Sequence, residues 1–234
     1  TTKLLIMFNL LKYTEIKDFI EKNNKNCQII AVSKNHPLEI VVEAIEGGVH
    51  IFGENRVMEA KSKFATLKQK NPKIELHLTG PLQSNKVKQA TLLFDVFHTL
   101  DREKIAAEFS KYRENLINKK IFIQVNTGEE ESKSGVKPKN LKNFLNFCTK
   151  EKNLNISGLM CIPPINDDPG KHFSFLKNLA NENNLSQLSI GMSNDYQIAL
   201  NFNPTYIRIG TILFGSRLWS KKLIYILISN QIIL

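Results

Sequence analysis

The stretch CQIIAVSKNHP, Cys27–Pro37, decides how this sequence is interpreted. Its residues Ile29–Val32 are all apolar, which is typical of a strand buried in a parallel sheet. Such a strand usually ends in a turn of Gly, Asn or Asp, but this one ends in Ser33-Lys34. An ammonium group that points into a protein interior loses its hydration. The lysine therefore needs a chemical reason for its position.

Apolar runs with strand character alternate with amphipathic helical segments along the whole chain. The predicted strands are Gln28–Val32, Val49–Phe52, Ile74–Thr79, Val96–Leu100, Ile121–Asn126, Ile156–Ile162, Leu188–Ile190 and Tyr206–Ile209. The predicted helices are Thr14–Glu21, before the first strand, and then Leu38–Glu46, Arg56–Gln69, Ser84–Leu93, Arg102–Ile117, Lys139–Lys152, Lys171–Asn181 and Asp195–Leu200.

Eight strands, each followed by a helical segment, predict an α/β fold: a (β/α)8 TIM barrel with an extra N-terminal helix. Such a barrel takes about 250 residues. The 234 residues are therefore predicted to form a single domain, 1–234, with residues 221–234 as an atypical apolar tail. An open doubly wound sheet is the alternative, although nothing in the sequence marks a switch in strand order. In a TIM barrel the active site lies at the carboxyl ends of the strands.

The composition limits the range of partners and compartments. The formal net charge is +10, but the lysines are scattered and no arginine-rich tract appears, so no nucleic-acid partner is predicted. No apolar run reaches the length of a membrane span, and no signal peptide is predicted. Cys27, Cys148 and Cys161 have no metal-site spacing and predict buried free thiols in a reducing compartment, the cytoplasm.

Lys34 has two possible explanations. As a structural residue, it would extend its ammonium from the strand end to water. As a functional residue, its amine would be held neutral by desolvation and by nearby cations, so that it can attack a carbonyl carbon. The sequence pattern around the strand leaves both explanations open.

Two glycine-bearing turns, SIGMSND and RIGTILFG, follow the last two predicted strands. TIM barrels commonly hold a phosphate at this place. Backbone N–H groups and the hydroxyls of Ser193 and Thr211 can bind phosphate oxygens, and Gly191 and Gly210 allow a close approach of the backbone. Turn formation and helix capping explain the same residues. A carbonyl-trapping lysine with a phosphate site on one barrel face suggests pyridoxal 5′-phosphate (PLP).

Eight segments carry a resemblance to a known family, and they occur in the family's order. They are AVSK, FGENRVMEA, LHLTGPLQSNK, HTLD, QVNTGEEESKSGV, GLMCIPP, SIGMSNDYQIAL and IRIGTILFGSR. From about Asn9 to Arg217 the chain resembles the PLP-binding, or PLP homeostasis, proteins, which are similar in fold to the N-terminal barrel of alanine racemase. The resemblance implies a cytoplasmic protein of PLP homeostasis.

The resemblance also implies roles for individual residues. Lys34 would carry PLP as an internal aldimine, a Schiff base. The other cofactor-binding residues would be Ser193, Gly210 and Thr211 at the phosphate, Met192 and Asn194 near it, Asn55 beside the ring, and Arg208 facing the pyridine nitrogen. No catalytic residue and no metal ligand is implied. Lys133, Asn85 and Lys86 match the family less specifically and would lie near the site.

Two functions fit these residues: a non-catalytic PLP carrier, or a PLP-dependent amino-acid racemase. A racemase needs proton-transfer groups on both faces of the substrate carbon. Alanine racemases complete the second face with a tyrosine from a second domain, which this chain has no residues left to build. We therefore expect a monomeric carrier that binds PLP and small amino acids and serves PLP-dependent apo-enzymes. His77 and His98, inside predicted strands, are expected to be structural.

Overall fold

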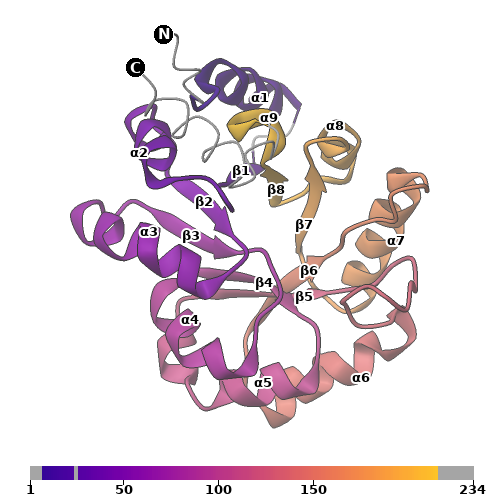
Figure 1. The fold of residues 1–234 in the computed structure, drawn as a ribbon. Coiled ribbons are helices and arrows are strands. Elements are labelled where there is room, and N and C mark those ends of the chain that lie inside the picture. The colour runs from indigo at the N-terminus through magenta and orange to yellow at the C-terminus, as the bar shows by residue number, and fades with distance from the viewer. Residues whose placement is uncertain (1–6, 24–25, 216–234) are drawn as a thin grey trace, which may run out of the picture.

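The computed structural model describes residues 7–23 and 26–215. Its eight strands are all parallel and close into a barrel in chain order, β1 to β8, with helices around the outside (Figure 1). The predicted TIM barrel is confirmed, and the open-sheet alternative is wrong because β8 pairs with β1. The predicted atypical tail, 221–234, lies outside the described residues.

The strands are short and begin and end close to their predicted positions. They are β1 (Gln28–Val32), β2 (Ile51–Glu54), β3 (Glu75–Leu78), β4 (Val96–Leu100), β5 (Lys120–Gln124), β6 (Ile156–Met160), β7 (Gln187–Met192) and β8 (Tyr206–Ile209). β2 begins two residues later than predicted, because the N–H of Val49 is used in the preceding turn, where it donates to the Ala44 carbonyl at 3.0 Å.

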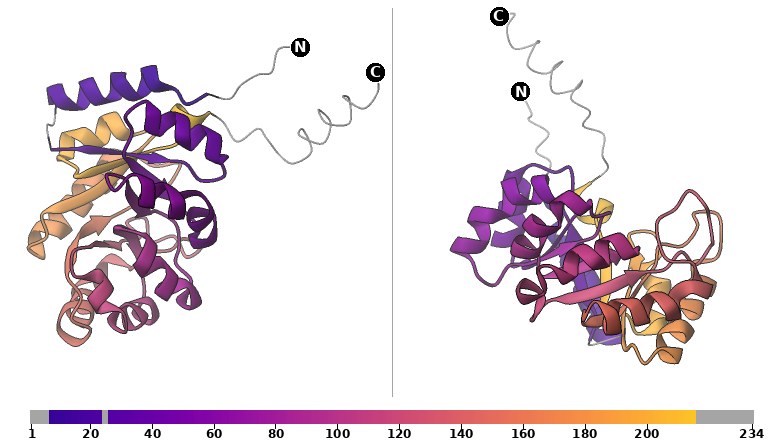
Figure 2. Two further views of the ribbon diagram at one scale, coloured as in Figure 1. Left: turned by 90° about the vertical axis from the view of Figure 1, so that its left-hand side faces the viewer. Right: turned by 90° about the horizontal axis from the view of Figure 1, so that it is seen from below.

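The helices cover the outer face of the barrel. They are α1 (Leu10–Asn23), α2 (Leu38–Glu46), α3 (Val57–Lys70), α4 (Val87–Leu93), α5 (Glu103–Ser110), α6 (Leu141–Asn146), α7 (Pro169–Glu182), α8 (Tyr196–Ala199) and α9 (Thr211–Phe214). The extra N-terminal helix α1 lies beside α9, where the Asn9 N–H donates to the Leu213 carbonyl at 2.9 Å (Figure 2).

Two predicted helices are shorter in the structure. The segment predicted as one helix from Arg102 to Ile117 ends at Ser110, because Tyr112 leaves the helical conformation at φ −123° and ψ 28°. A short 3-10 turn then buries Leu116. The predicted helix Lys139–Lys152 is helical to Asn146 and continues as a wider, i to i+5, turn that buries Cys148.

Side chains alternate between the two faces of each strand, as strand geometry requires. In β1, Ile30 and Val32 belong to a small apolar cluster inside the barrel, whereas Ile29 and Ala31 belong to the larger core between barrel and helices. In β8, Ile207 and Ile209 lie in the outer core, so Arg208 between them points into the barrel. The same alternation directs Lys34, two residues beyond Val32, into the barrel.

Candidate functional site

A cavity of about 560 Å³ lies at the carboxyl end of the barrel. Small-molecule sites usually measure ~300–1,000 Å³, so its size suits a ligand such as a cofactor. Each of the eight strands contributes lining residues from its last positions or from the loop that follows. The structure brings together in this wall all of the residues predicted to bind the cofactor: Lys34, Asn55, Met192, Ser193, Asn194, Arg208, Gly210 and Thr211.

The cavity wall is strongly cationic. Lys34, Lys133 and Arg208 line it, and the described lining residues include no aspartate, glutamate or histidine. Charges inside a cavity act through a lower effective dielectric than charges at an open surface, so the three cations attract an anion more strongly there. The cavity therefore favours an anionic ligand such as a phosphate ester.

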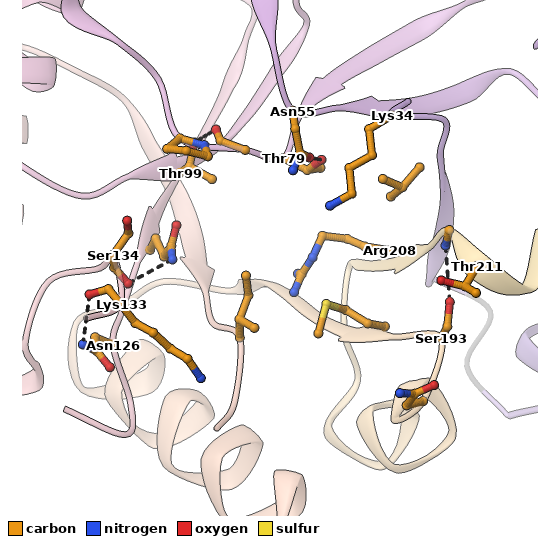
Figure 3. Close-up of a pocket in the computed structure, with 18 of the residues that line it drawn as sticks. Lys34, Asn55, Thr79, Thr99, Asn126, Lys133, Ser134, Ser193, Arg208 and Thr211 are labelled. Atoms are coloured by element: carbon orange, nitrogen blue, oxygen red, sulfur yellow. Dashed lines mark hydrogen bonds between the residues drawn. The ribbon is translucent and has the colours of Figure 1, made fainter. Parts of the chain in front are cut away.

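Lys34 lies two residues after the end of β1 and is half-buried. Its side chain extends into the cavity, toward the same space as Arg208 (Figure 3). The next residue, Asn35, adopts a left-handed conformation at φ 62°, which asparagine tolerates better than most residues. This turn carries the chain outward immediately after the lysine, and so it leaves the amine inside the cavity.

A buried polar cluster lies on the outer side of the barrel at the ends of β1 and β2, just before Lys34 and Asn55. The Ser33 hydroxyl donates to a Glu54 carboxylate oxygen at 2.7 Å, and the Lys63 ammonium of α3 lies 2.6 Å from the same oxygen. Lys63 also donates to the Ser33 carbonyl at 2.9 Å. Burial raises the pKa of Glu54, and its contacts with Lys63 and Ser33 oppose that shift. The cluster fixes the ends of β1 and β2, and so the starting points of the two site residues.

The proposed phosphate side of the cavity is formed after β7 and β8. Ser193 and Thr211 lie side by side there, and the Gly210 N–H is 3.4 Å from the Ser193 hydroxyl oxygen (Figure 3). Gly191 does not line the cavity, so the expectation that it lets the backbone approach a ligand is wrong. Its φ is +88° and an added Cβ would lie 2.7 Å from the Ala199 Cβ, so packing against α8 requires the glycine.

Arg208 is 5% exposed and forms part of the cavity floor. Its guanidinium donates to the carbonyl and hydroxyl oxygens of Ser189, both at 2.7 Å, and to the Cys161 carbonyl at 2.9 Å. Burial lowers the pKa of Arg208, but arginine remains protonated at neutral pH. Its hydrogen-bond partners among the described residues are all neutral oxygens, and none is a carboxylate. Neutral acceptors leave its positive charge uncompensated beside the cavity.

Further lining residues come from strand ends that the sequence analysis named without assigning a role. The Thr79 hydroxyl, after β3, donates to the Asn55 side-chain oxygen at 3.0 Å and so orients that amide. An added Cβ on Gly80 would lie 2.6 Å from the Asn55 backbone, so only glycine fits there. Position within three residues of the end of a barrel strand was the signal that could have found five further lining residues: Pro81, Thr99, Gln124, Asn126 and Ile162.

The side of the cavity opposite the Ser193 turn is a loop after β5. Its Lys133 lines the cavity and its ammonium lies 2.6 Å from a Glu130 carboxylate oxygen. The Asn126 side chain donates to the Glu130 carbonyl at 2.8 Å and shapes this loop. Asn85 and Lys86, the other weaker matches, do not line the cavity.

Other reactive side chains stay outside the cavity. Cys27, Cys148 and Cys161 are free and buried, as predicted, and burial raises the pKa of each thiol to about 12. Within the described ranges, no group of three or more His, Cys, Asp or Glu side chains is arranged for a metal ion. In the same ranges, no helix is long and apolar enough to cross a membrane.

Comparison with known proteins agrees with this arrangement. The family model described as alanine racemase, N-terminal domain, matches residues 12–218. The pyridoxal phosphate homeostasis protein of Vibrio cholerae is 40% identical over 206 residues, 83% of this chain and 87% of that protein. The chain belongs to the pyridoxal phosphate homeostasis protein family. The family member from Aquifex aeolicus is 37% identical over 205 residues, 82% of this chain and 89% of that protein.

Solved structures of the family have the same fold. PipY of Synechococcus elongatus with PLP bound is 32% identical, with a TM-score of 0.74 over 86% of this chain and 99% of that one. An alanine racemase of Clostridium difficile, at 12% identity and a TM-score of 0.67, covers 94% of this chain and 61% of that one. This last likeness concerns the fold alone.

Proposed function

We propose that this protein binds pyridoxal 5′-phosphate in the cationic cavity, with Lys34 as its covalent attachment point, and that it serves intracellular PLP homeostasis as a carrier. The observation that carries the proposal is the placement of Lys34 inside a cavity whose described lining contains three cations and no acidic side chain. Family membership supports it, since the related PipY structure is described as having PLP bound.

The side chains fit the chemistry of the cofactor at three points. PLP supplies an aldehyde that condenses with a primary amine, and the amine of Lys34 faces the cavity. The hydroxyls of Ser193 and Thr211 and the Gly210 N–H form a polar corner that suits phosphate oxygens. Met192 and Asn194 flank this corner.

Two residues remain for the aromatic ring. Asn55, oriented by the Thr79 hydroxyl, presents its amide beside the position of the ring. Arg208 presents a permanent positive charge where the pyridine nitrogen would lie, and a neighbouring guanidinium disfavours protonation of that nitrogen. An unprotonated ring withdraws electrons less strongly, which suits storage of the cofactor better than carbanion chemistry.

The carrier function is favoured over racemase activity by the proton-transfer groups in the cavity. No tyrosine or histidine lines it in the described part of the chain, and Lys133 faces it with its ammonium paired to Glu130. Lys133 is nevertheless a second amine in the same cavity, and the sequence analysis expected it only near the site. We infer that Lys133 holds the loop after β5 through Glu130 rather than acting as a second base, because its ammonium lies 2.6 Å from that carboxylate.

A binding titration tests the proposal. Purified protein is titrated with PLP and with pyridoxal, and visible absorbance reports attachment. We expect tight binding of PLP, much weaker binding of pyridoxal, and loss of the visible band in Lys34→Ala. Lys86→Ala, which changes a half-buried lysine outside the cavity wall, should bind as wild type. Equal affinity for PLP and pyridoxal, or an unchanged band in Lys34→Ala, would contradict the proposal.

Racemase activity is tested separately with the PLP-loaded protein. We expect amino acids to shift the absorbance and PLP to transfer to apo-enzymes, without sustained conversion of L-alanine to D-alanine. Multiple turnovers that disappear in both Lys34→Ala and Lys133→Met would identify a two-base racemase instead. Small amino acids and apo-enzymes as partners, the cytoplasmic location, the single-domain organisation and the monomeric state all remain predictions.

A further inference from the structure

Five polar residues form a continuous hydrogen-bonded chain through the barrel interior. Glu75 Oε1 lies 2.7 Å from His77 Nε2, and His77 Nδ1 lies 2.8 Å from His98 Nε2. His98 Nδ1 lies 2.9 Å from the Ser189 hydroxyl oxygen, which accepts from Arg208 at 2.7 Å. The chain connects the cavity floor to Glu75, the first residue of β3, at the opposite end of the barrel.

With neutral histidines, only one direction of donation satisfies every link. The Glu75 carboxylate can only accept, so the hydrogen of His77 is on Nε2 and its Nδ1 is an acceptor. His98 must then donate from Nε2, so its Nδ1 accepts from the Ser189 hydroxyl. Ser189 in turn accepts from Arg208, which can only donate. All the hydrogen bonds therefore point from the guanidinium in the cavity toward the carboxylate at the far end.

The surroundings favour neutral imidazoles. Both rings are fully buried, and burial lowers the pKa of His77 and His98. Near His77, the carboxylates of Glu75 and Asp95 oppose this shift and the ammonium of Lys120 reinforces it. Near His98, the positive charges of Arg208 and Lys120 and the neighbouring His77 ring all lower the His98 pKa further. The Glu75 end of this hydrogen-bonded chain reaches solvent, because 35% of the Glu75 side chain is exposed.

We propose that Ser189, His98 and His77 are positioning residues that hold the Arg208 guanidinium toward the ligand and link it to Glu75. A chain whose members all donate in one direction strengthens each of its bonds in a medium of low dielectric. It also makes the acceptor strength of Ser189, and so the position of the guanidinium, depend on a carboxylate that never contacts the ligand.

The first test uses the protein without cofactor, so it does not depend on the proposed function. Imidazole nitrogens of ¹⁵N-histidine-labelled protein are assigned with His77→Gln and His98→Gln, and their NMR shifts at pH 7 report protonation. We expect both rings to be neutral, with hydrogen on Nε2 only. An imidazolium at either position, or hydrogen on Nδ1 of either ring, would overturn the proposal.

The second test rests on the proposed function and compares two replacements of His98. The amide of His98→Gln can accept from Ser189 and donate to His77, whereas His98→Leu breaks the chain. We expect PLP affinity to fall about tenfold and the pH profile of the visible band to move in the leucine variant, with both restored in the glutamine variant. Wild-type behaviour of the leucine variant would contradict the proposal. Failure of the wild-type protein to bind PLP would instead refute the proposed function.

A third variant covers the case in which His98→Leu does not fold. Glu75→Gln removes the charge at the foot of the chain and keeps an acceptor oxygen, at a partly exposed site. We expect the pH profile of the visible band to shift in the same direction as in His98→Leu, but by less. The matched control is Glu39→Gln on the exposed face of α2, which should leave the profile unchanged. Identical profiles for these two variants would count against the link between Glu75 and the cavity.

Discussion

The carboxyl-end half of the barrel interior is an open cavity with cationic walls, whereas the amino-end half is packed with rings. His98 stacks on Phe122 with ring centroids 4.9 Å apart, and His77 meets the Tyr206 ring edge-on, also at 4.9 Å. Tyr206 and Arg208 belong to the same strand, two residues apart. Two residues along one face of β8 thus separate two layers of the barrel interior. The lower layer, at the amino end, stabilises the barrel, and the upper layer, at the carboxyl end, lines the ligand cavity.

The polar side chains of the two layers differ in the partners that they meet. Polar groups of the lower layer satisfy one another: Lys120 donates to the Tyr206 hydroxyl at 2.8 Å, and the histidines bond to each other. In the upper layer, hydroxyls and cations from several strand ends converge on one cavity. Burial alone does not distinguish the two layers, because both contain fully or nearly fully buried polar residues.

The largest expected effect concerns the buried Glu54–Lys63 ion pair, which supports the strand ends that carry Lys34 and Asn55. Lys63→Met leaves the buried Glu54 carboxylate without its cation, and removing one member of a buried pair costs about 3–5 kcal/mol. We expect the free energy of unfolding, from denaturant titration, to fall by this amount. Lys61→Met, an exposed position of the same helix, is the control and should change little. Equal stability of the two variants would show that the pair does not support the site.

The next prediction concerns the lower layer and pH. The unfolded chain protonates its histidines below about pH 6.5, while burial lowers the folded-state pKa of His77 and His98. The unfolded state therefore binds more protons in this range. Stability should fall as the pH drops below about 6.5, by up to about 1.4 kcal/mol per pH unit for each such histidine.

Replacement of one ring isolates this contribution. His98→Gln removes one titrating group from the lower layer, so its stability should depend less steeply on pH between neutrality and pH 5. Urea unfolding at a series of pH values measures both slopes. The same slope in the variant and the wild-type protein would mean that His98 is protonated in the folded state, or that it titrates equally in both states.

These two layers also show what the sequence could predict. The strand and helix periodicity predicted the barrel. The rule that strand ends carry the site predicted Lys34, Ser193, Gly210 and Thr211, whereas Asn55, Met192, Asn194 and Arg208 came from the resemblance to a known family. The Glu54–Lys63 pair and the histidine chain were not predicted, because their partners are 9 and 21 residues apart or more and meet only through barrel closure and helix packing. The two interrupted helices were missed because local amphipathicity continues through the point where the backbone turns.

A smaller effect is expected for the phosphate corner of the upper layer. Loss of both hydroxyls in Ser193→Ala/Thr211→Ala should weaken PLP binding by about 1–3 kcal/mol, at 0.5–1.5 per hydrogen bond, without a comparable effect on pyridoxal. Isothermal titration with both ligands measures the two affinities. An equal loss for PLP and pyridoxal would place the hydroxyls elsewhere than at the phosphate.

The smallest expected effect separates the layers at a single strand. Tyr206→Phe removes the hydroxyl that Lys120 contacts in the lower layer and keeps the ring packing. Stability should fall by about 0.5–1.5 kcal/mol. PLP affinity should stay at the wild-type value, because the hydroxyl lies at the amino end of β8. A loss of affinity that exceeds the loss of stability would mean that this hydroxyl, and not only the histidine chain, connects the lower layer to the cavity.

The central claim is that the inward-facing lysine after β1 is where the cofactor attaches, and peptide mapping tests it most directly. Wild-type protein is incubated with PLP, reduced with borohydride, digested and analysed by mass spectrometry. The account predicts one major modified peptide, with the pyridoxyl group on Lys34, and no such peptide from Lys34→Ala. Modification that falls mainly on Lys133 or on surface lysines in the wild-type protein, and persists unchanged in Lys34→Ala, would contradict the account.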